Sequence, residues 1–146
     1  MKYSKQHENA VIYIHSIQKS DDQTDSTELN CKGIYLFTPD RIQIVYPELN
    51  DDGSASGITV ISVIGSTLVT VQKTGFTESG MVLEKGKTHE AVYSTIVGSM
   101  DMLLSTIDIQ SKLDSKGGTL KLHYFLEIIN NDFSAENILD LRVSLF

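Results

Sequence analysis

The sequence predicts an all-β protein, an antiparallel up-and-down barrel of about 8–10 strands. Most of the chain alternates apolar and polar residues with a period of two, which is typical of strands that bury one face. The dipeptide Gly-Ser occurs between β-branched runs at Gly65 and again at Gly98. A glycine in that position favours the tight turn of a hairpin. No helix longer than a turn is predicted.

The size and composition of the chain indicate one soluble globular domain over residues 1–146. Hydrophobic residues make up 40% of the 146 residues and the net charge is −7. So acidic a chain repels phosphate backbones and anionic lipid, and we therefore expect neither nucleic acid nor a membrane as a partner. One cysteine, no signal-peptide pattern and no apolar run long enough to span a bilayer predict a cytoplasmic protein.

The N-terminal third is predicted to form a strand, a loop and a hairpin. Residues 9–17 alternate, whereas residues 19–27 are acidic and polar, which is typical of a loop. Residues 28–37 and 41–46 are β-rich runs, and Pro39 between them presets the backbone of a type I turn. Their pairing is expected to bring together on one face Tyr35, Phe37, Ile42 and Ile44.

The middle of the chain is predicted to contain a loop, a hairpin and a short strand. Residues 47–57 are rich in Asp, Asn, Gly and Ser and form the loop. Residues 58–64 and 67–74 are β-branched runs that meet across Gly65-Ser66. Residues 81–85 complete this part as a short strand.

Residues 91–109 suit either an amphipathic helix or a hairpin, and their composition favours the hairpin. Gly98 would weaken a helix at its middle by ~1 kcal/mol relative to alanine. Seven residues are β-branched and stiff at χ1: Val92, Thr95, Ile96, Val97, Thr106, Ile107 and Ile109. Turning at Gly98-Ser99 would place Val97 opposite Met100, Thr95 opposite Met102, and Tyr93 opposite Leu104.

The C-terminal part is predicted to contain two further strands. Residues 110–118 read as a connection, residues 119–129 alternate, residues 130–137 form a loop and residues 138–146 alternate again. A sheet of this many strands curls and closes or splits into two layers. A closed barrel is therefore the first expectation and a β-sandwich the second.

No catalytic residue, metal site or cofactor is predicted from the sequence. The four histidines lack the spacing of metal ligands, and Cys31 shares the inward face of its strand, where a thiol behaves as a small apolar group. The acidic run around Asp21 lacks the glycine and glutamate of a calcium loop. Glycine-rich elements precede strands and not helices, so a phosphate-binding loop is also excluded.

Three segments follow one another in a characteristic order: CKGIYLF–RIQIVYPE, GITVISVIGSTLVTVQKTG and AVYSTIVGSMDMLLSTIDIQSKLDSKGGTLKLHYFLEI. In these segments and their order the chain resembles, over roughly residues 11–129, the YwiB-like family of small bacterial proteins, a domain of unknown function. The resemblance implies a calycin-like barrel, related in form to the lipocalins. Such barrels typically hold small hydrophobic ligands.

Two hypotheses for function follow from the faces of the predicted strands, and a third is weaker. An apolar or amphipathic ligand inside the barrel would meet the predicted inward aromatic residues: Tyr35, Phe37, Tyr46, Tyr93 and Tyr124. A homodimer or partner contact would instead use the outer face of the 91–109 hairpin: Val92, Ile96, Leu103 and Ile107. An enzyme would require polar residues to converge inside the barrel, for example Gln72, Lys121 and Arg142.

Overall fold

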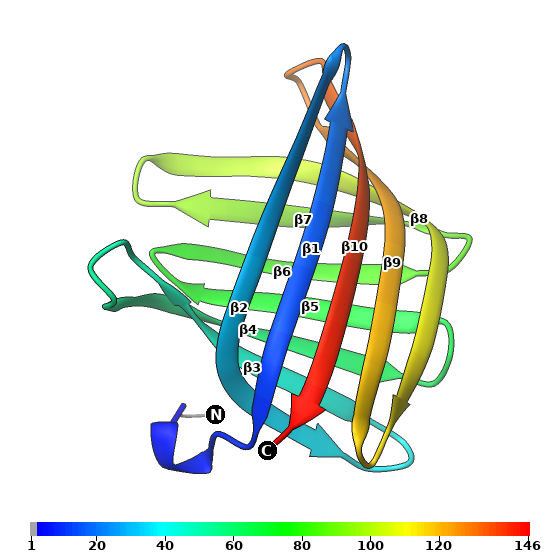
Figure 1. The fold of residues 1–146 in the computed structure, drawn as a ribbon. Coiled ribbons are helices and arrows are strands. Elements are labelled where there is room, and N and C mark those ends of the chain that lie inside the picture. The colour runs from blue at the N-terminus through cyan, green and yellow to red at the C-terminus, as the bar shows by residue number, and fades with distance from the viewer. Residues whose placement is uncertain (1–2) are drawn as a thin grey trace.

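A computed structural model describes residues 3–146, which form a closed antiparallel barrel of ten strands (Figure 1). Consecutive strands are neighbours and β1 closes the barrel against β10, so the predicted up-and-down barrel is confirmed and the sandwich is wrong. A 3₁₀ turn, η1 (Lys5–His7), precedes the barrel. The strands are β1 (Ala10–Ser20), β2 (Gln23–Phe37), β3 (Ile42–Leu49), β4 (Ala55–Ile64), β5 (Leu68–Gly75), β6 (Thr77–Glu84), β7 (Thr88–Thr95), β8 (Gly98–Asp114), β9 (Gly117–Ile128) and β10 (Phe133–Leu145).

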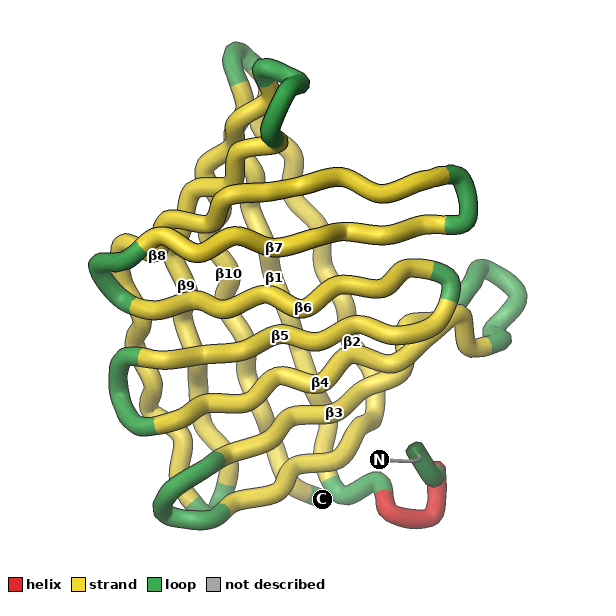
Figure 2. Tube along the Cα trace, turned by 180° about the vertical axis from the view of Figure 1, so that it is seen from behind, coloured by secondary structure: helices red, strands yellow, loops and turns green. Residues whose placement is uncertain are grey.

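The barrel consists of two layers that cross, joined by two long strands (Figures 1 and 2). In Figure 1, β1, β9 and β10 run steeply, whereas β3 to β7 run across behind them. The corner strand β2 pairs with β1 through residues 23–33 and then with β3 through residues 34–37. The other corner strand, β8, pairs with β7 over residues 98–105 and with β9 over residues 102–114. Strands that change partner in this way close two crossing layers into one barrel.

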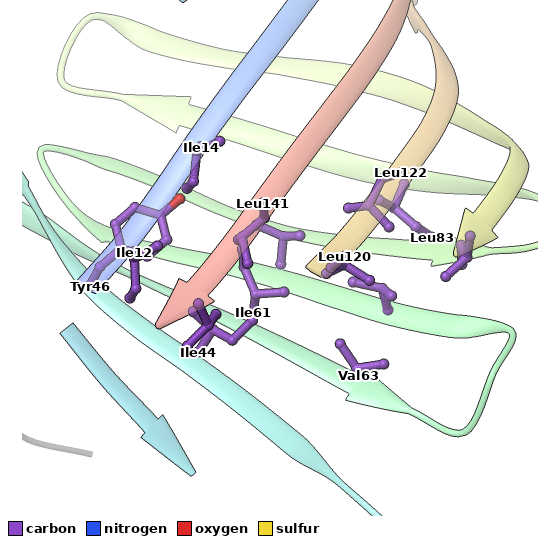
Figure 3. Close-up of a cluster of buried hydrophobic side chains, with 14 of the residues drawn as sticks. Ile12, Ile14, Ile44, Tyr46, Ile61, Val63, Leu83, Leu120, Leu122 and Leu141 are labelled. Atoms are coloured by element: carbon purple, nitrogen blue, oxygen red, sulfur yellow. The ribbon is translucent and has the colours of Figure 1, made fainter. Parts of the chain in front are cut away.

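Branched aliphatic side chains fill the space between the layers (Figure 3). Alternate residues of each strand face inward, as the period of two requires. These inward residues interdigitate, which removes apolar surface from water and stabilises the closed sheet. The largest fully buried apolar side chains include Ile12, Ile44, Ile61, Leu83, Leu104, Leu120, Leu122 and Leu141.

Three predicted loops are in fact mostly strand. Asp21-Asp22 alone separates β1 from β2, Ser115-Lys116 separates β8 from β9, and β10 already begins at Phe133. The β1–β2 tip extends past the core, and Gln23 to Glu28 are exposed on both faces of β2, so the apolar-polar alternation disappears there. In the other two segments inward residues such as Leu113 and Ala135 still pack against the core or are buried, although most of their neighbours are polar. Figure 1 shows the β1–β2 hairpin projecting beyond the rest of the barrel. Polarity therefore indicated exposure here, and not the absence of a strand.

The predicted pairing at Pro39 is confirmed, and the turn at Gly65 differs in detail. Tyr35 lies opposite Ile44, and Phe37 lies opposite Ile42. β4 and β5 pair as far as Ile64 and Leu68, so their connection has three residues and not the two of Gly65-Ser66. Gly65 has a φ of 66°, the left-handed conformation that such a connection needs and that glycine adopts most easily.

The hairpin at residues 91–109 is confirmed, but its turn lies two residues earlier than predicted. Thr95 is opposite Gly98 and Tyr93 is opposite Met100, so the turn consists of Ile96 and Val97. The Thr95 hydroxyl supports this turn, because it donates to the Gly98 carbonyl at 3.1 Å and accepts from the Val97 amide at 3.3 Å. The turn lies an even number of residues from its predicted position. Each strand therefore keeps its predicted inward and outward faces. Val97, expected inside, is instead 91% exposed.

Candidate functional site

One end of the barrel carries apolar side chains that project into water. The connections β3–β4, β5–β6 and β7–β8 lie at this end and point to the left in Figure 1. We define the rim as the exposed apolar residues in or directly beside these connections: Leu49 (53% exposed), Phe76 (65%), Ile96 (90%) and Val97 (91%). Hairpin tips are usually polar, so exposed apolar side chains at three of them are unusual.

Directly inside the rim, five successive strands contribute inward residues that bear polar groups. Each of them is the cross-strand partner of the next, from β3 to β7. They lie on the same face of the strands as the buried Ile44 and Ile61, which places them inside the barrel. We define them as the polar layer: Tyr46, Thr59, Lys73, Ser79 and Tyr93.

A charged pair anchors the polar layer. Lys73 Nζ lies 3.2 Å from Glu48 Oε1, and both side chains remain about a third exposed, at 33% and 35%. The Thr59 hydroxyl donates to the same Glu48 oxygen at 2.8 Å, and Thr59 itself is completely buried. Because Glu48 follows Tyr46 by two residues on β3, it has the same inward orientation, one step nearer the rim. The lumen is thus apolar at one end and charged at the other.

The tyrosines near this layer are held in their protonated form. Burial, and secondarily the negative charge of Glu48, raises the pKa of Tyr46 well above its ordinary value. Burial likewise raises the pKa of Tyr124. Thr106, opposite Tyr124 on β8, is 3% exposed, and its hydroxyl has no hydrogen-bond partner among residues 3–146. A buried hydroxyl without a partner is uncommon, because desolvating it costs free energy that no bond offsets.

The structure separates the five aromatic residues predicted to meet a ligand. Tyr46 and Tyr93 belong to the polar layer, and Tyr124 faces the lumen close enough to Tyr46 to affect its pKa. Tyr35 is buried near the other end, where its hydroxyl donates to the Asp114 carbonyl at 2.7 Å. Burial raises its pKa to about 12. Phe37 lies on the same face of β2 as Tyr35, opposite Ile42, and is 38% exposed at the end of the strand.

Sequence reasoning missed the two charged residues of the site. Glu48 fell in a predicted loop, although β3 continues through it to Leu49. Lys73 lies on the same inward face of β5 as the buried Val69 and Val71. A lysine at the next inward position of this apolar series was the sequence feature that could have revealed it. The polar residues proposed for an enzyme do not converge inside the barrel, since all of them are exposed: Gln72, Lys121 and Arg142.

The predicted interface residues spread along the whole β7–β8 hairpin. Val92 (50% exposed) and the half-buried Leu103 lie near each other on the outer face, in two grooves that Ile129 also lines. Ile96 is at the tip, and Ile107, 45% exposed, lies at an irregularity where β8 changes register against β9. The earlier position of the turn explains the spread, because Ile96 no longer pairs with Asp101, which lies opposite Val92.

Grooves with volumes of about 320 to 560 Å³ lie along the wall of the barrel. None of these is lined by the five predicted aromatic residues. Within residues 3–146, no three His, Cys, Asp or Glu side chains gather closely enough to hold a metal ion. The same part of the chain contains no helix with the length and hydropathy needed to cross a membrane.

Two of the histidines lie close to carboxylates, and the cysteine is partly buried. His89 lies 2.9 Å from Glu84, and His123 lies 2.6 Å from Glu136. Cys31 is half-buried, and burial followed by the charge of Glu8 raises its thiol pKa. A raised pKa disfavours the thiolate, which is the nucleophilic form.

Comparisons with known proteins agree with this fold. The chain is 24% identical over 124 residues to the uncharacterized beta-barrel protein YwiB of Bacillus subtilis (strain 168), and the match covers 85% of each chain. The crystal structure of the ywiB protein from Bacillus subtilis superimposes with a TM-score of 0.83 at 20% identity, covering 97% of this chain and 94% of that one. The model of the family described as Domain of unknown function (DUF1934) matches residues 12–141. The chain therefore belongs to this family of β-barrel proteins of unknown function.

Proposed function

We propose that the protein is a binding module that takes a small amphipathic molecule at the rim end of the barrel. The observation that carries the proposal is the Glu48–Lys73 pair, held inside the lumen against a filled apolar interior. Partly desolvated charges give little stability, and apolar residues of similar size would often serve as well. A charged pair at this position is therefore better explained by a ligand than by folding.

The chemistry of this end defines the class of ligand. Lys73 offers a cation, and Tyr46 and Tyr124 offer hydroxyl donors that stay protonated at neutral pH. The rim adds exposed aromatic and aliphatic surface around them. An anionic head group against Lys73 with an apolar body against the rim would use both features. The apolar half of the lumen is packed with aliphatic side chains, so the ligand lies at the mouth and not deep in the barrel.

Replacing Lys73 with glutamine should weaken the binding of an amphipathic anion by about tenfold, because it removes a charge-assisted contact. The fluorescent probe 1-anilinonaphthalene-8-sulfonate, which joins a sulfonate to apolar rings, measures this by titration. Lys116→Gln is the matched control, since Lys116 lies in the β8–β9 connection at the opposite end.

The variant Glu48→Gln separates a binding role from a structural one. It leaves Lys73 without its partner carboxylate, so binding of the anionic probe should be kept or become tighter. If the pair only maintains the fold, both variants will weaken binding together and lower the urea midpoint together. Equal probe binding by wild type and Lys73→Gln would contradict the proposal, as would native mass spectra that never show an adduct under any growth condition.

The exposed outer face of the β7–β8 hairpin supports a second candidate, a symmetric homodimer. Val92, Leu103 and Ile129 line adjacent grooves there, and β6 pairs with β7 at only three positions, residues 77–79 with residues 93–95. A two-fold dimer would bury this face against its own copy. The sheet would thereby cover apolar residues that otherwise meet water.

Leu103→Asp should leave the barrel folded and convert such a dimer to a monomer, because an unpaired carboxylate opposes burial in an interface. Sedimentation velocity measures the change at a protein concentration of tens of micromolar. A dimer with a dissociation constant of ~1 μM would be mostly assembled at that concentration. Ser105→Asp, on the same outer face two residues along β8, is the control. A wild-type protein that sediments as a monomer would exclude the dimer, and an unfolded Leu103→Asp would show that this side chain belongs to the core.

A further inference from the structure

A groove of about 370 Å³ on the outside of the barrel gathers basic side chains in an otherwise acidic protein. It crosses β1, β10, β9 and β8 on the steep layer of Figure 1, on the opposite side of the barrel wall from the lumen. We define the basic groove by the residues that carry the argument, all of which line it: His15, Lys112, Thr119, Lys121, Asp140 and Arg142.

The strand register brings three cations around a single hydroxyl. Thr119 on β9 lies directly opposite Lys112 on β8 and directly opposite Arg142 on β10. Lys121 lies two residues along β9 from Thr119, on the same face. With strands about 4.8 Å apart and about 7 Å between alternate residues, all three long side chains can reach the space above Thr119. We call this arrangement, three cationic side chains on three sides of the Thr119 hydroxyl, the cup.

The cations of the groove are available to a ligand. Lys73, Lys85 and Lys87 each pair with a carboxylate. By contrast, within residues 3–146 the ion pairs and side-chain hydrogen bonds include none to Lys112, Lys121 or Arg142. The groove lining holds 3 of the 12 Lys and Arg residues of the chain but only 1 of its 19 Asp and Glu residues. The charged residues of the lining therefore sum to a positive formal charge, although the net charge of the chain is −7.

We propose that the basic groove binds the phosphate group of a small phosphate monoester. A phosphate presents three oxygens, one for each of Lys112, Lys121 and Arg142, and the guanidinium can bind two oxygens at once. A carboxylate carries a single negative charge, whereas a phosphate monoester carries about −1.5 to −2, so three cations favour the phosphate. This site is separate from the rim end and does not depend on the function proposed there.

Asp140 restricts the ligand to a single phosphate. It lies directly opposite Lys121 on one side and directly opposite His15 on the other, at the border of the cup. Its charge repels a second phosphate placed along the groove, and this disfavours polyphosphates and nucleic acid. The Asp140 carboxylate is instead suited to accept a hydrogen bond from a hydroxyl or amino group elsewhere on the ligand.

The test is a titration of the full chain with inorganic phosphate, followed by amide chemical shifts in about 150 mM salt, where weak nonspecific attraction is screened. Saturable shifts are expected at the amides of Lys112, Thr119, Lys121 and Arg142. Arg142→Gln and Lys121→Gln should each raise the dissociation constant by about tenfold. Lys85→Gln is the control, because Lys85 pairs with Asp108 outside the groove lining and should leave binding unchanged.

Three results would overturn the proposal. The first is the absence of saturable shifts up to ~10 mM phosphate. The dissociation constant would then exceed ~10 mM, and such a binding free energy is too small for a specific site. The second is equal weakening by Lys85→Gln and Arg142→Gln, which would reveal general electrostatic attraction. The third is tighter binding of tripolyphosphate or a short DNA duplex than of phosphate, which would identify a polyanion surface. Unchanged amide shifts elsewhere in the two groove variants will show that both remain folded.

Discussion

Gly118→Ala is expected to lower the free energy of unfolding by about 3 kcal/mol or more. Gly118 has a φ of 133°, a conformation that residues with a Cβ atom rarely adopt. A Cβ atom at this position would also overlap the backbone carbonyl oxygen of Lys112 on β8. Neither the strain nor the overlap can be relieved by turning a side chain, because both involve backbone held by strand pairing. Urea unfolding followed by circular dichroism measures the effect.

Gly80→Ala is the matched control for this prediction. A Cβ atom at Gly80 would meet no other atom within 4 Å, and Gly80 is absent from the glycines with positive φ. Alanine there should be neutral or stabilising by up to ~1 kcal/mol, since it reduces the freedom of the unfolded chain. Similar destabilisation by both substitutions would mean that glycine content in general, and not the close approach of β8 and β9, limits stability.

Leu104→Ala is expected to destabilise the barrel by about 3 kcal/mol, within the range for large-to-small changes in a core. Leu104 is completely buried on β8. Removing its branched end leaves a cavity between the two layers that the surrounding strands can close only partly. The measurement is again the midpoint of urea unfolding. A lower midpoint with an unchanged m-value reports a loss of stability and no change in the compactness of the folded or unfolded state.

Ile107→Ala tests the same strand at an exposed position. Ile107 is 45% exposed and belongs to the predicted outer face, so its truncation should cost about 0.5 kcal/mol or less. The pair of variants therefore tests which face of β8 meets the core. A larger loss from Ile107→Ala than from Leu104→Ala would reverse the inward and outward assignment of the strand.

The position of each hairpin turn was less predictable than the faces of its strands. At Pro39 the turn residue has a preset backbone, and the predicted pairing of Tyr35 with Ile44 is correct. At Gly98 the sequence favoured a turn at glycine, whereas the chain turns at Ile96-Val97 and uses the Thr95 hydroxyl to support it. Exposing two β-branched residues at a tip contradicts local preference, so no local rule indicated it.

The candidate site was predictable in part. Tyr46, Tyr93 and Tyr124 were identified because they continue the apolar alternation of their strands. Tyr35 was assigned to the same site but lies toward the other end, since alternation indicates the face of a residue and not its depth along the barrel. Glu48 and Lys73 required the closed barrel, because their approach to 3.2 Å joins β3 to β5 across β4.

The sequence by itself determined the strand-rich class of this protein, the inward face of most strands and the up-and-down order of the barrel. These properties depend on near neighbours in the chain, through the period of two and the chemistry of turns. Tertiary structure alone decided how far the polar strands extend, where β2 and β8 change partners, and which charges meet. The meeting of Glu48 with Lys73 inside the barrel depends on register between strands, as does the placement of Lys112 and Arg142 on either side of Thr119 outside it. That register is selected by packing of the whole closed sheet, which no single segment encodes.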